Sequence, residues 1–208
     1  MNRALGWLGQ QPINSPVTPE TTAGKALADI YEQVRKAVLA TYYWNFAEVT
    51  DDATWLGLSK SPFRDEYVYP SKCMKLIKCT TDTGERFKKY RIAFNPTENT
   101  KVIQIDNNSK STLRVVYNYD ITEIVHWSPL AQEVFALMLA MGAANSVLGK
   151  ENSTLKELND LLTEMLKDAT SVDGQEQPYP VEEIYQTELA RLGYQDADDY
   201  DDGLLVRF

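Results

Sequence analysis

Histidine and cysteine are scarce in this 208-residue sequence, which contains one His and two Cys. So few imidazoles and thiols leave little from which to build a transition-metal site. Basic residues are also outnumbered, with 21 Lys and Arg against 30 Asp and Glu, giving a formal net charge of −9. Phosphate neutralisation needs clustered basic residues, so the composition argues against a DNA-binding protein of the usual kind. Hydrophobic residues make up 43% of the chain, which excludes a mostly disordered protein.

Long hydrophobic runs are also missing. The longest, 134–147, is interrupted by Gly142 and Asn145 and is shorter than the ~20 residues that cross a bilayer. The N-terminal segment has no long apolar core of the kind found in a signal peptide. The sequence therefore predicts neither a membrane span nor export. Cys73 and Cys79 lie too far apart along one strand-like stretch to bond to each other, and we interpret them as reduced residues of an intracellular protein.

The first 64 residues predict mainly helix. A short amphipathic segment around Trp7 is followed by a proline-containing stretch over 9–19, where no regular element is expected. Thr18 can cap a following helix, with Pro19 at the first helical position, where a missing N–H costs nothing. This helix should end near Ala40. Its apolar positions recur at helical spacing: Ala23, Leu27, Ile30, Val34, Ala37 and Val38.

The middle of the chain predicts strands. Segments rich in β-branched and aromatic residues cover 67–69, 74–79, 87–94, 102–105 and 113–117, and turn-forming residues separate several of them. Short strands in series with tight turns predict an antiparallel meander that closes into a small barrel or sandwich.

Helices return after this region. Ser128 and Pro129 are typical of an N-cap and first turn, and an apolar 3.6-residue period leads to Gly149 as a C-terminal cap. A second helix should begin at Asn152 or Ser153, with leucines and methionines on one side. The short connection predicts that the two helices are antiparallel.

The predicted fold class is α+β. A helical bundle from both ends of the chain holds an inserted antiparallel β barrel or sandwich and continues into an extended C-terminal arm. The predicted segments are 1–64 (N-terminal part of the bundle), 65–122 (β domain), 123–172 (helix pair completing the bundle) and 173–208 (linker, short helix and acidic arm).

The C-terminal arm combines an acidic run over 195–203 with an apolar end. So many carboxylates do not pack into a core, and exposed apolar residues at a terminus favour docking on another protein. The predicted partner-binding residues are Tyr200, Leu204, Leu205, Val206 and Phe208.

No catalytic, cofactor-binding or metal-ligating set is predicted. His126 stands beside Trp127 at a strand-to-helix junction, where a packed or surface histidine is more common than a general base. Gly149 and Lys150 lack the Ser or Thr of a phosphate loop. The acidic residues 198–203 have Tyr200 at the second ligand position of a calcium loop, so we interpret them as a solvated segment.

The β region is locally basic although the chain is acidic. With aromatic residues interleaved, it could suit a nucleic-acid surface, but a solvated face or a contact to an acidic partner is favoured. The basic residues are Lys72, Lys75, Lys78, Lys88, Lys89 and Arg91.

Four features, in this order along residues 3–170, resemble one known family. They are Leu5-Gly6-Trp7-Leu8-Gly9-Gln10-Gln11-Pro12-Ile13-Asn14-Ser15, then Tyr43-Trp44-Asn45-Phe46-Ala47, then Tyr69-Pro70 at the opening of the β region, and Ala143-Ala144 late in the first helix of the pair. Together they resemble the tail tubular protein A family, the head-to-tail adaptors of short-tailed bacteriophages. The sequence departs from that pattern at Gln10, where the family has an acidic residue, and at Tyr43, where it has Trp.

The resemblance implies a non-enzymatic structural protein of the virion neck, assembled in the cytoplasm of the host bacterium. It implies a ring, usually dodecameric, that docks on the portal protein and receives the tail nozzle protein. DNA only passes through the lumen of such a ring, and an acidic chain suits that role because it repels phosphate.

Three alternatives remain open. The chain could be another nozzle or head-completion protein, or a tail-borne cell-wall hydrolase that uses a carboxylate of raised pKa. It could also be a nucleic-acid-binding module that uses the basic β region.

Overall fold

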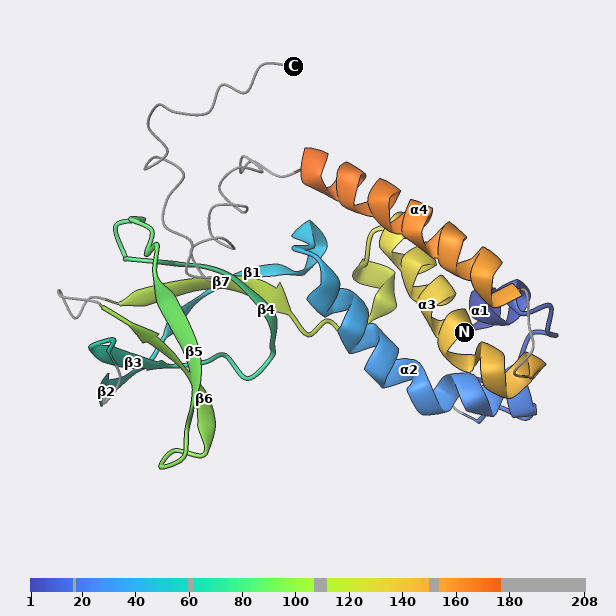
Figure 1. The fold of residues 1–208 in the computed structure, drawn as a ribbon, viewed down its shortest axis with the longest axis horizontal. Helices are drawn as coiled ribbons and strands as arrows, with labels where there is room; N and C mark the ends of the chain where they lie inside the picture. The colour runs from blue at the N-terminus through green and yellow to red at the C-terminus, as the bar shows by residue number, and fades with distance from the viewer. Residues whose placement is uncertain (17, 60–61, 107–111, 150–153, 177–208) are drawn as a thin grey trace, which may run out of the picture. The chain divides into compact units, whose positions relative to one another are not determined.

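The computed structural model describes residues 1–16, 18–59, 62–106, 112–149 and 154–176 (Figure 1). The fold mixes helices with two antiparallel sheets, and the chain divides into two compact units. The first, which we call the helical unit, comprises Met1–Val49 and the chain from Tyr117 through the last described helix. The second, the β unit, is Thr50–Val116 among the described residues. Sequence analysis had placed the β region at 65–122.

The helical unit is organised around one central helix. Its four helices are α1 (Asn2–Trp7), α2 (Thr22–Thr41), α3 (Pro129–Leu148) and α4 (Thr154–Gln175), with 3₁₀ turns at η1 (Asn45–Ala47) and η2 (Ile124–His126). Helix α3 packs against each of α1, α2 and α4. It therefore buries side chains on several sides: Ala131, Val134, Phe135, Ala136, Leu137, Leu139, Ala140, Ala143 and Ala144.

Helix α3 is long and apolar enough to cross a membrane by length and composition, because it covers 20 residues with a mean hydropathy of 1.3. The expectation that no segment reaches that length is wrong on this point. Half of its most apolar window is buried inside the structure, and three neighbouring helices contact it. Packing at the centre of the helical unit accounts for its apolar character.

The ends of α3 are as the sequence predicted, whereas the start of α2 is not. Ser128 Oγ accepts a hydrogen bond from the backbone N–H of Ala131 at 3.4 Å, and Gly149 adopts a positive φ of 87°. The cap of α2 is Thr21, whose Oγ1 accepts from the backbone N–H of Gly24 at 3.0 Å. The prediction of Thr18 as the cap was wrong. Thr18 instead donates its backbone N–H to Ser15 Oγ at 3.3 Å, in the segment that precedes the helix.

The strands form two separate sheets rather than one closed barrel. One sheet has the order β1-β7-β4 and the other β2-β3-β6-β5. Strands β1 and β2, consecutive in the chain, were not predicted from the sequence, because as outer strands they show little alternation of burial. The bounds are β1 (Glu48–Ala53), β2 (Trp55–Leu58), β3 (Asp65–Val68), β4 (Cys73–Thr80), β5 (Tyr90–Asn95), β6 (Thr100–Ile105) and β7 (Leu113–Tyr119).

Helix α4 extends beyond the boundary at residue 172 that the sequence indicated. It runs through Asp173 and Gly174 to Gln175. The buried Asp173 accepts from the backbone N–H of Asn45 at 3.0 Å, and Asn45 Nδ2 donates to the Asp173 carbonyl at 2.5 Å. These contacts join two segments 128 residues apart and stabilise the last turn of the helix. The predicted start of this helix, at Asn152 or Ser153, lies outside the described residues.

Candidate interaction surface

The partner-binding residues predicted from the sequence are Tyr200, Leu204, Leu205, Val206 and Phe208. All five lie outside the described residues, as do the predicted linker and acidic run beyond residue 176. A candidate site has to be found in the described part of the chain.

Side chains with catalytic potential do not converge there. His126 is exposed and lies 3.2 Å from Glu123 Oε2 on the same turn. Cys73 is buried and its thiol donates to the Tyr69 hydroxyl at 3.0 Å. Burial raises the pKa of this thiol to about 11, so it stays protonated at neutral pH and is a poor nucleophile. Among the described residues, no group of three or more His, Cys, Asp or Glu could hold a metal ion.

The residues of the first family-like block form a closed turn after α1. Leu5 and Leu8 are buried, as is Ile13 further along the block. The Asn2 side chain accepts from the backbone N–H of Ile13 at 3.0 Å and donates to its carbonyl at 3.1 Å. Gly9 has a φ of 64°, which favours glycine where the chain leaves the helix. The block therefore fixes the N-terminal segment of the helical unit.

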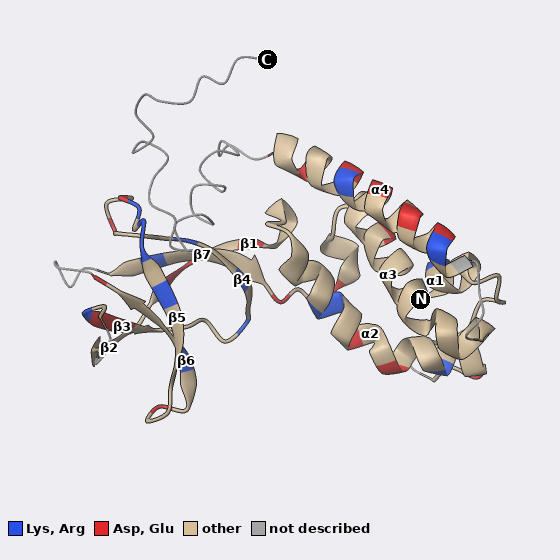
Figure 2. Cartoon of the chain, viewed as in Figure 1, with Lys and Arg blue, Asp and Glu red and all other residues tan. Residues whose placement is uncertain are grey.

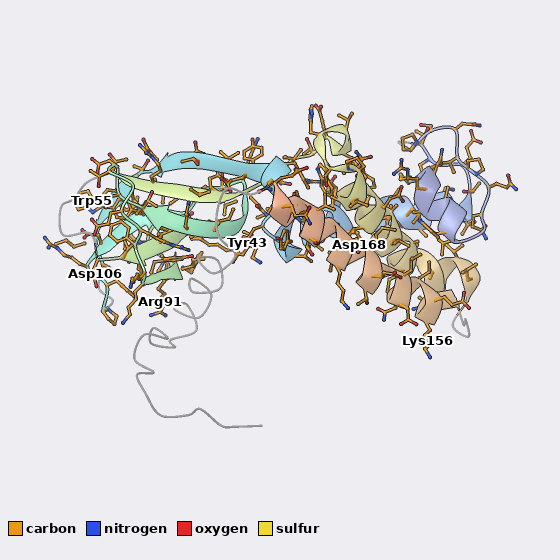
Figure 3. All side chains as sticks on the ribbon, turned by 90° about the horizontal axis from the view of Figure 1, so that it is seen from above. Tyr43, Trp55, Arg91, Asp106, Lys156 and Asp168 are labelled. Atoms are coloured by element: carbon orange, nitrogen blue, oxygen red, sulfur yellow. The ribbon has the colours of Figure 1, made fainter. Side chains whose placement is uncertain are left out.

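The second block lies in a chain of aromatic contacts. Trp44 is fully buried and its Nε1 donates to the Val38 carbonyl at 2.7 Å. Ring centroids lie 5.1–5.6 Å apart at each successive step. The steps run from Tyr42 to Trp44, Phe46, Trp127, Phe135 and Tyr31, which joins the turn after α2 to α3 and back to α2. Figure 3 labels Tyr43 of the same block, which is buried as well.

Two buried charged groups also have structural roles in the helical unit. Arg35 of α2 is almost completely buried and donates from Nη1 to Asp120 Oδ1 at 2.5 Å and to the Ile121 carbonyl at 2.8 Å. Its Nη2 pairs with Glu32 at 2.8 Å. For Asp173, burial raises the pKa to about 6, against the hydrogen bond from Asn45, which lowers it. The partners of both groups account for their burial without a catalytic role.

The β unit exposes apolar side chains on both outer strands of its four-stranded sheet. On β2, Trp55 is 45%, Leu56 37% and Leu58 67% exposed, and on β5 Phe94 is 61% exposed. Trp55 Nε1 donates to Asp65 Oδ1 at 3.2 Å, which orients that ring. Sequence reasoning missed β2 and so missed this surface. The available signal was three large apolar residues in a short segment that lacks the period of a buried element.

Charge separates the β unit from the rest of the chain. Residues 50–116 contain 12 basic and 8 acidic residues, a net charge of +4, although the whole chain carries −9. Figure 2 shows Lys and Arg gathered on β4 and β5, whereas α4 carries several acidic residues. A basic unit within an acidic chain is a surface suited to an acidic partner.

No protein-family model matches this chain, and no curated protein matches it. The family resemblance therefore depends on the residues quoted above.

Proposed function

We propose that this chain is a structural head-to-tail adaptor subunit of a phage virion, which forms a ring between the portal and the tail nozzle. In this proposal DNA passes through the lumen of the ring and the chain has no enzymatic activity. The finer architecture belongs to the same proposal: a helical bundle built from both ends of the chain, an inserted β domain, and an extended C-terminal arm that docks on the portal.

The observation that carries the proposal is where the family-like motifs lie in the fold. The block that begins at Leu5 and the block around Trp44 are separated by α2, yet both supply buried residues to the helical unit. The β unit lies between α2 and α3 in the chain. Tyr69-Pro70, expected to open the β region, lies instead after β3 within this unit, because the strands β1 and β2 were not predicted. Motifs that determine the packing of a unit support a shared fold better than surface matches would.

The distribution of charge is also compatible with this role. Outside residues 50–116 the chain has 9 basic and 22 acidic residues. A lumen lined by such surfaces would repel phosphates and allow DNA to pass without binding. The basic β unit would then contact acidic protein surfaces of the assembly.

Electron microscopy of the full chain mixed with the portal and nozzle proteins of the same phage tests the proposal. We expect a ring that joins the two partners. A chain that joins neither would refute the adaptor role.

Removal of residues 195–208 tests the arm separately. We expect portal binding to be lost while the β unit and helical unit still fold, as monitored by circular dichroism. The substitution Leu204→Asp with Phe208→Asp serves as a second variant that keeps the chain length. Retention of portal binding by both variants would show that the arm is not the docking element.

A further inference from the structure

We propose that the acidic run of the C-terminal arm, residues 195–203, binds a basic strip on the β unit of the same chain. The strip consists of five cationic residues: Lys78, Arg86, Lys88, Lys89 and Arg91. The inference goes beyond the proposed function and does not depend on it, because both halves of the contact belong to this chain. The strip lies among the described residues, and the acidic run lies outside them.

A tight turn after β4 brings the first two cations of the strip together. Phe87 donates its backbone N–H to the Cys79 carbonyl at 2.9 Å, which holds the segment after the turn against the end of β4. Arg86 is thereby paired with Thr80 in an antiparallel bridge. Lys78 lies two residues before Thr80 in β4, and residues two apart in a strand share a face. Arg86 and Lys78 are therefore diagonal neighbours in this pairing, within reach of each other's long side chains.

The other three cations follow Arg86 along the chain into β5. Lys88, Lys89 and Arg91 are all exposed, and Figure 2 shows basic residues where the chain enters β5. The distance from Arg86 to Arg91 is at most ~18 Å, because each residue adds no more than ~3.6 Å. Residues 78–91 contain five basic and two acidic residues, a net charge of +3. Like charges held this close repel one another, so an anionic partner on the strip would be stabilising.

The acidic run carries the complementary charge over a similar length. Five of its nine residues are aspartate, and residues 192–206 contain neither Lys nor Arg. From the first aspartate to the last, the run spans at most ~22 Å when extended, which covers the ~18 Å between Arg86 and Arg91. Charges of opposite sign, matched in number and spacing, make a complementary contact. The aspartates are Asp196, Asp198, Asp199, Asp201 and Asp202.

The covalent connection selects the chain's own run as the occupant of the strip. Eighteen residues, 177–194, join the last described residue to the acidic run, and such a segment reaches ~60 Å when extended. Groups joined by a tether meet at effective concentrations on the order of millimolar. A second copy or a nucleic acid has to bind at its own free concentration. A nucleic acid is also repelled by the rest of the chain, which has 9 basic and 22 acidic residues outside 50–116.

Such a contact is reversible. Exposed ion pairs are individually weak and are screened by salt, so a partner with a stronger acidic surface can displace the run. The apolar residues 204–208 follow the run and are not part of the contact. The strip therefore keeps the arm close to the β unit while its apolar residues remain available to another protein.

Zero-length carbodiimide crosslinking of the full chain tests the contact. The reagent joins a lysine amine to a carboxylate only where the two groups touch, and mass spectrometry of the peptides identifies the pair. We expect the run to crosslink to Lys78, Lys88 or Lys89 at ~0.05 M salt, and at least about threefold less at ~0.5 M salt, where exposed charges are screened. In an equal mixture of isotope-labelled and unlabelled chain, each crosslinked pair should come from one isotopic form, because the contact lies within one chain.

Arg91→Glu reverses one charge of the strip and leaves every lysine in place. It should lower the yield of these crosslinks about threefold or more, because a repulsive pair replaces an attractive one. Lys36→Glu, on the exposed side of α2, makes a charge change of the same size and should leave the yield unchanged. Both positions are exposed, so the fold should tolerate the substitutions, and thermal melting by circular dichroism establishes that each variant is folded.

A second measurement reads the contact without any reagent. Neutralising the run keeps the chain length and the apolar residues, and should shift the backbone NMR signals of residues 86–91 while those of α2 stay in place. At ~0.5 M salt the two chains should give the same signals over 86–91, because the contact is already screened. The neutralised chain carries Asp196→Asn, Asp198→Asn, Asp199→Asn, Asp201→Asn and Asp202→Asn.

The inference is overturned if the run crosslinks to the strip no more often than to Lys25 and Lys36 of the helical unit, or if Arg91→Glu and Lys36→Glu give equal yields. Crosslinks between the two isotopic forms, or NMR signals over 86–91 that are indifferent to the run, overturn it as well. A full chain that binds a DNA duplex through the strip, with the run uncrosslinked, assigns the strip to nucleic acid instead. None of these measurements involves the portal, so their failure leaves the adaptor proposal standing, and a chain that ignores the portal leaves this contact standing.

Discussion

Replacement of Asp173 by Asn should change how the stability of the helical unit depends on pH. Burial raises the pKa of Asp173 from its ordinary 3.8 to about 6, and the nearby Glu176 and Glu48 contribute in the same direction. The folded state therefore binds this proton more tightly than the unfolded state does. The resulting stabilisation is complete below pH 3.8 and is lost as the pH rises through about 6.

The size of the effect follows from the two pKa values. A tenfold difference in proton affinity corresponds to about 1.4 kcal/mol, so the ionised carboxylate lowers the unfolding free energy by up to about 3 kcal/mol at high pH. Asn is neutral at every pH and can still accept the hydrogen bond from the Asn45 backbone. Because that bond is weaker to a neutral acceptor, we expect a net gain of about 1–2 kcal/mol at pH 8. Roughly 1 kcal/mol of the difference should develop between pH 5 and pH 8.

Urea unfolding followed by tryptophan fluorescence measures this difference. Trp44 and Trp127 report on the helical unit, and a Trp55→Phe background removes the tryptophan of the β unit. Asp168→Asn is a matched control, because Asp168 is an exposed residue of the same helix (Figure 3). A difference between Asp173→Asn and its parent that stays constant from pH 5 to pH 8 would refute the reasoning. So would a variant that is less stable than its parent at pH 8.

Three further predictions concern packing and thiol chemistry. Arg35→Ala should lower the unfolding free energy by about 3 kcal/mol, because it leaves Asp120 without its buried partner. Lys36→Ala, on the exposed side of α2, should change the unfolding free energy by under ~0.5 kcal/mol. Equal effects of the two substitutions in urea unfolding would contradict this prediction. Gly24→Ala should destabilise the folded chain by about 1 kcal/mol, since the added Cβ would lie 2.9 Å from Pro19 Cβ. A Cβ at Gly6 would meet no atom within 4 Å, so Gly6→Ala should be neutral or stabilising. Thermal melting compares the two variants. Cys73 and Cys79 should react slowly with an aromatic disulfide reagent at pH 8 and rapidly after denaturation. Both thiols are buried, and the pKa of Cys73 is raised to about 11. Fast labelling of the folded chain would disprove this prediction.

Residues close to the ends of α3 were enough to predict where that helix begins and ends. Ser128 caps α3 through a contact three residues away, and Gly149 ends it through its own backbone conformation. The start of α2 depends on more than its sequence. Thr18 and Pro19 form a good capping pair, but Thr21 supplies the cap, and Gly24 packs closely against Pro19 and Ile13. Tertiary packing overrode the local preference.

Long-range pairing set the limits of prediction for the β unit. The strands β3 to β7 were indicated by composition, but their order in two sheets depends on pairings such as Asp65 with Ile105, which no local pattern records. The outer strands β1 and β2 expose polar and apolar residues alike, so they lack the alternation that identifies a strand.

The candidate site was harder to predict than the fold. A surface made of exposed side chains has no characteristic period. The contact of Asp173 with Asn45 joins residues 128 positions apart, and neither segment contains a sequence pattern that indicates it. The apolar C-terminal residues, which the sequence did single out, remain a prediction.

The irregularity at Gly57 has a consequence for sequence evolution. Trp55 pairs with Tyr67 and Leu58 with Asp65, so β2 holds one extra residue between Trp55 and Leu58, and this number of residues decides whether the two side chains lie on the same face of the sheet. Relatives of this chain should tolerate exchanges among large apolar residues at 55 and 58, yet resist a single insertion or deletion between them. The spacing around this glycine, rather than residue identity, would then be the more durable signature by which distant relatives are recognised.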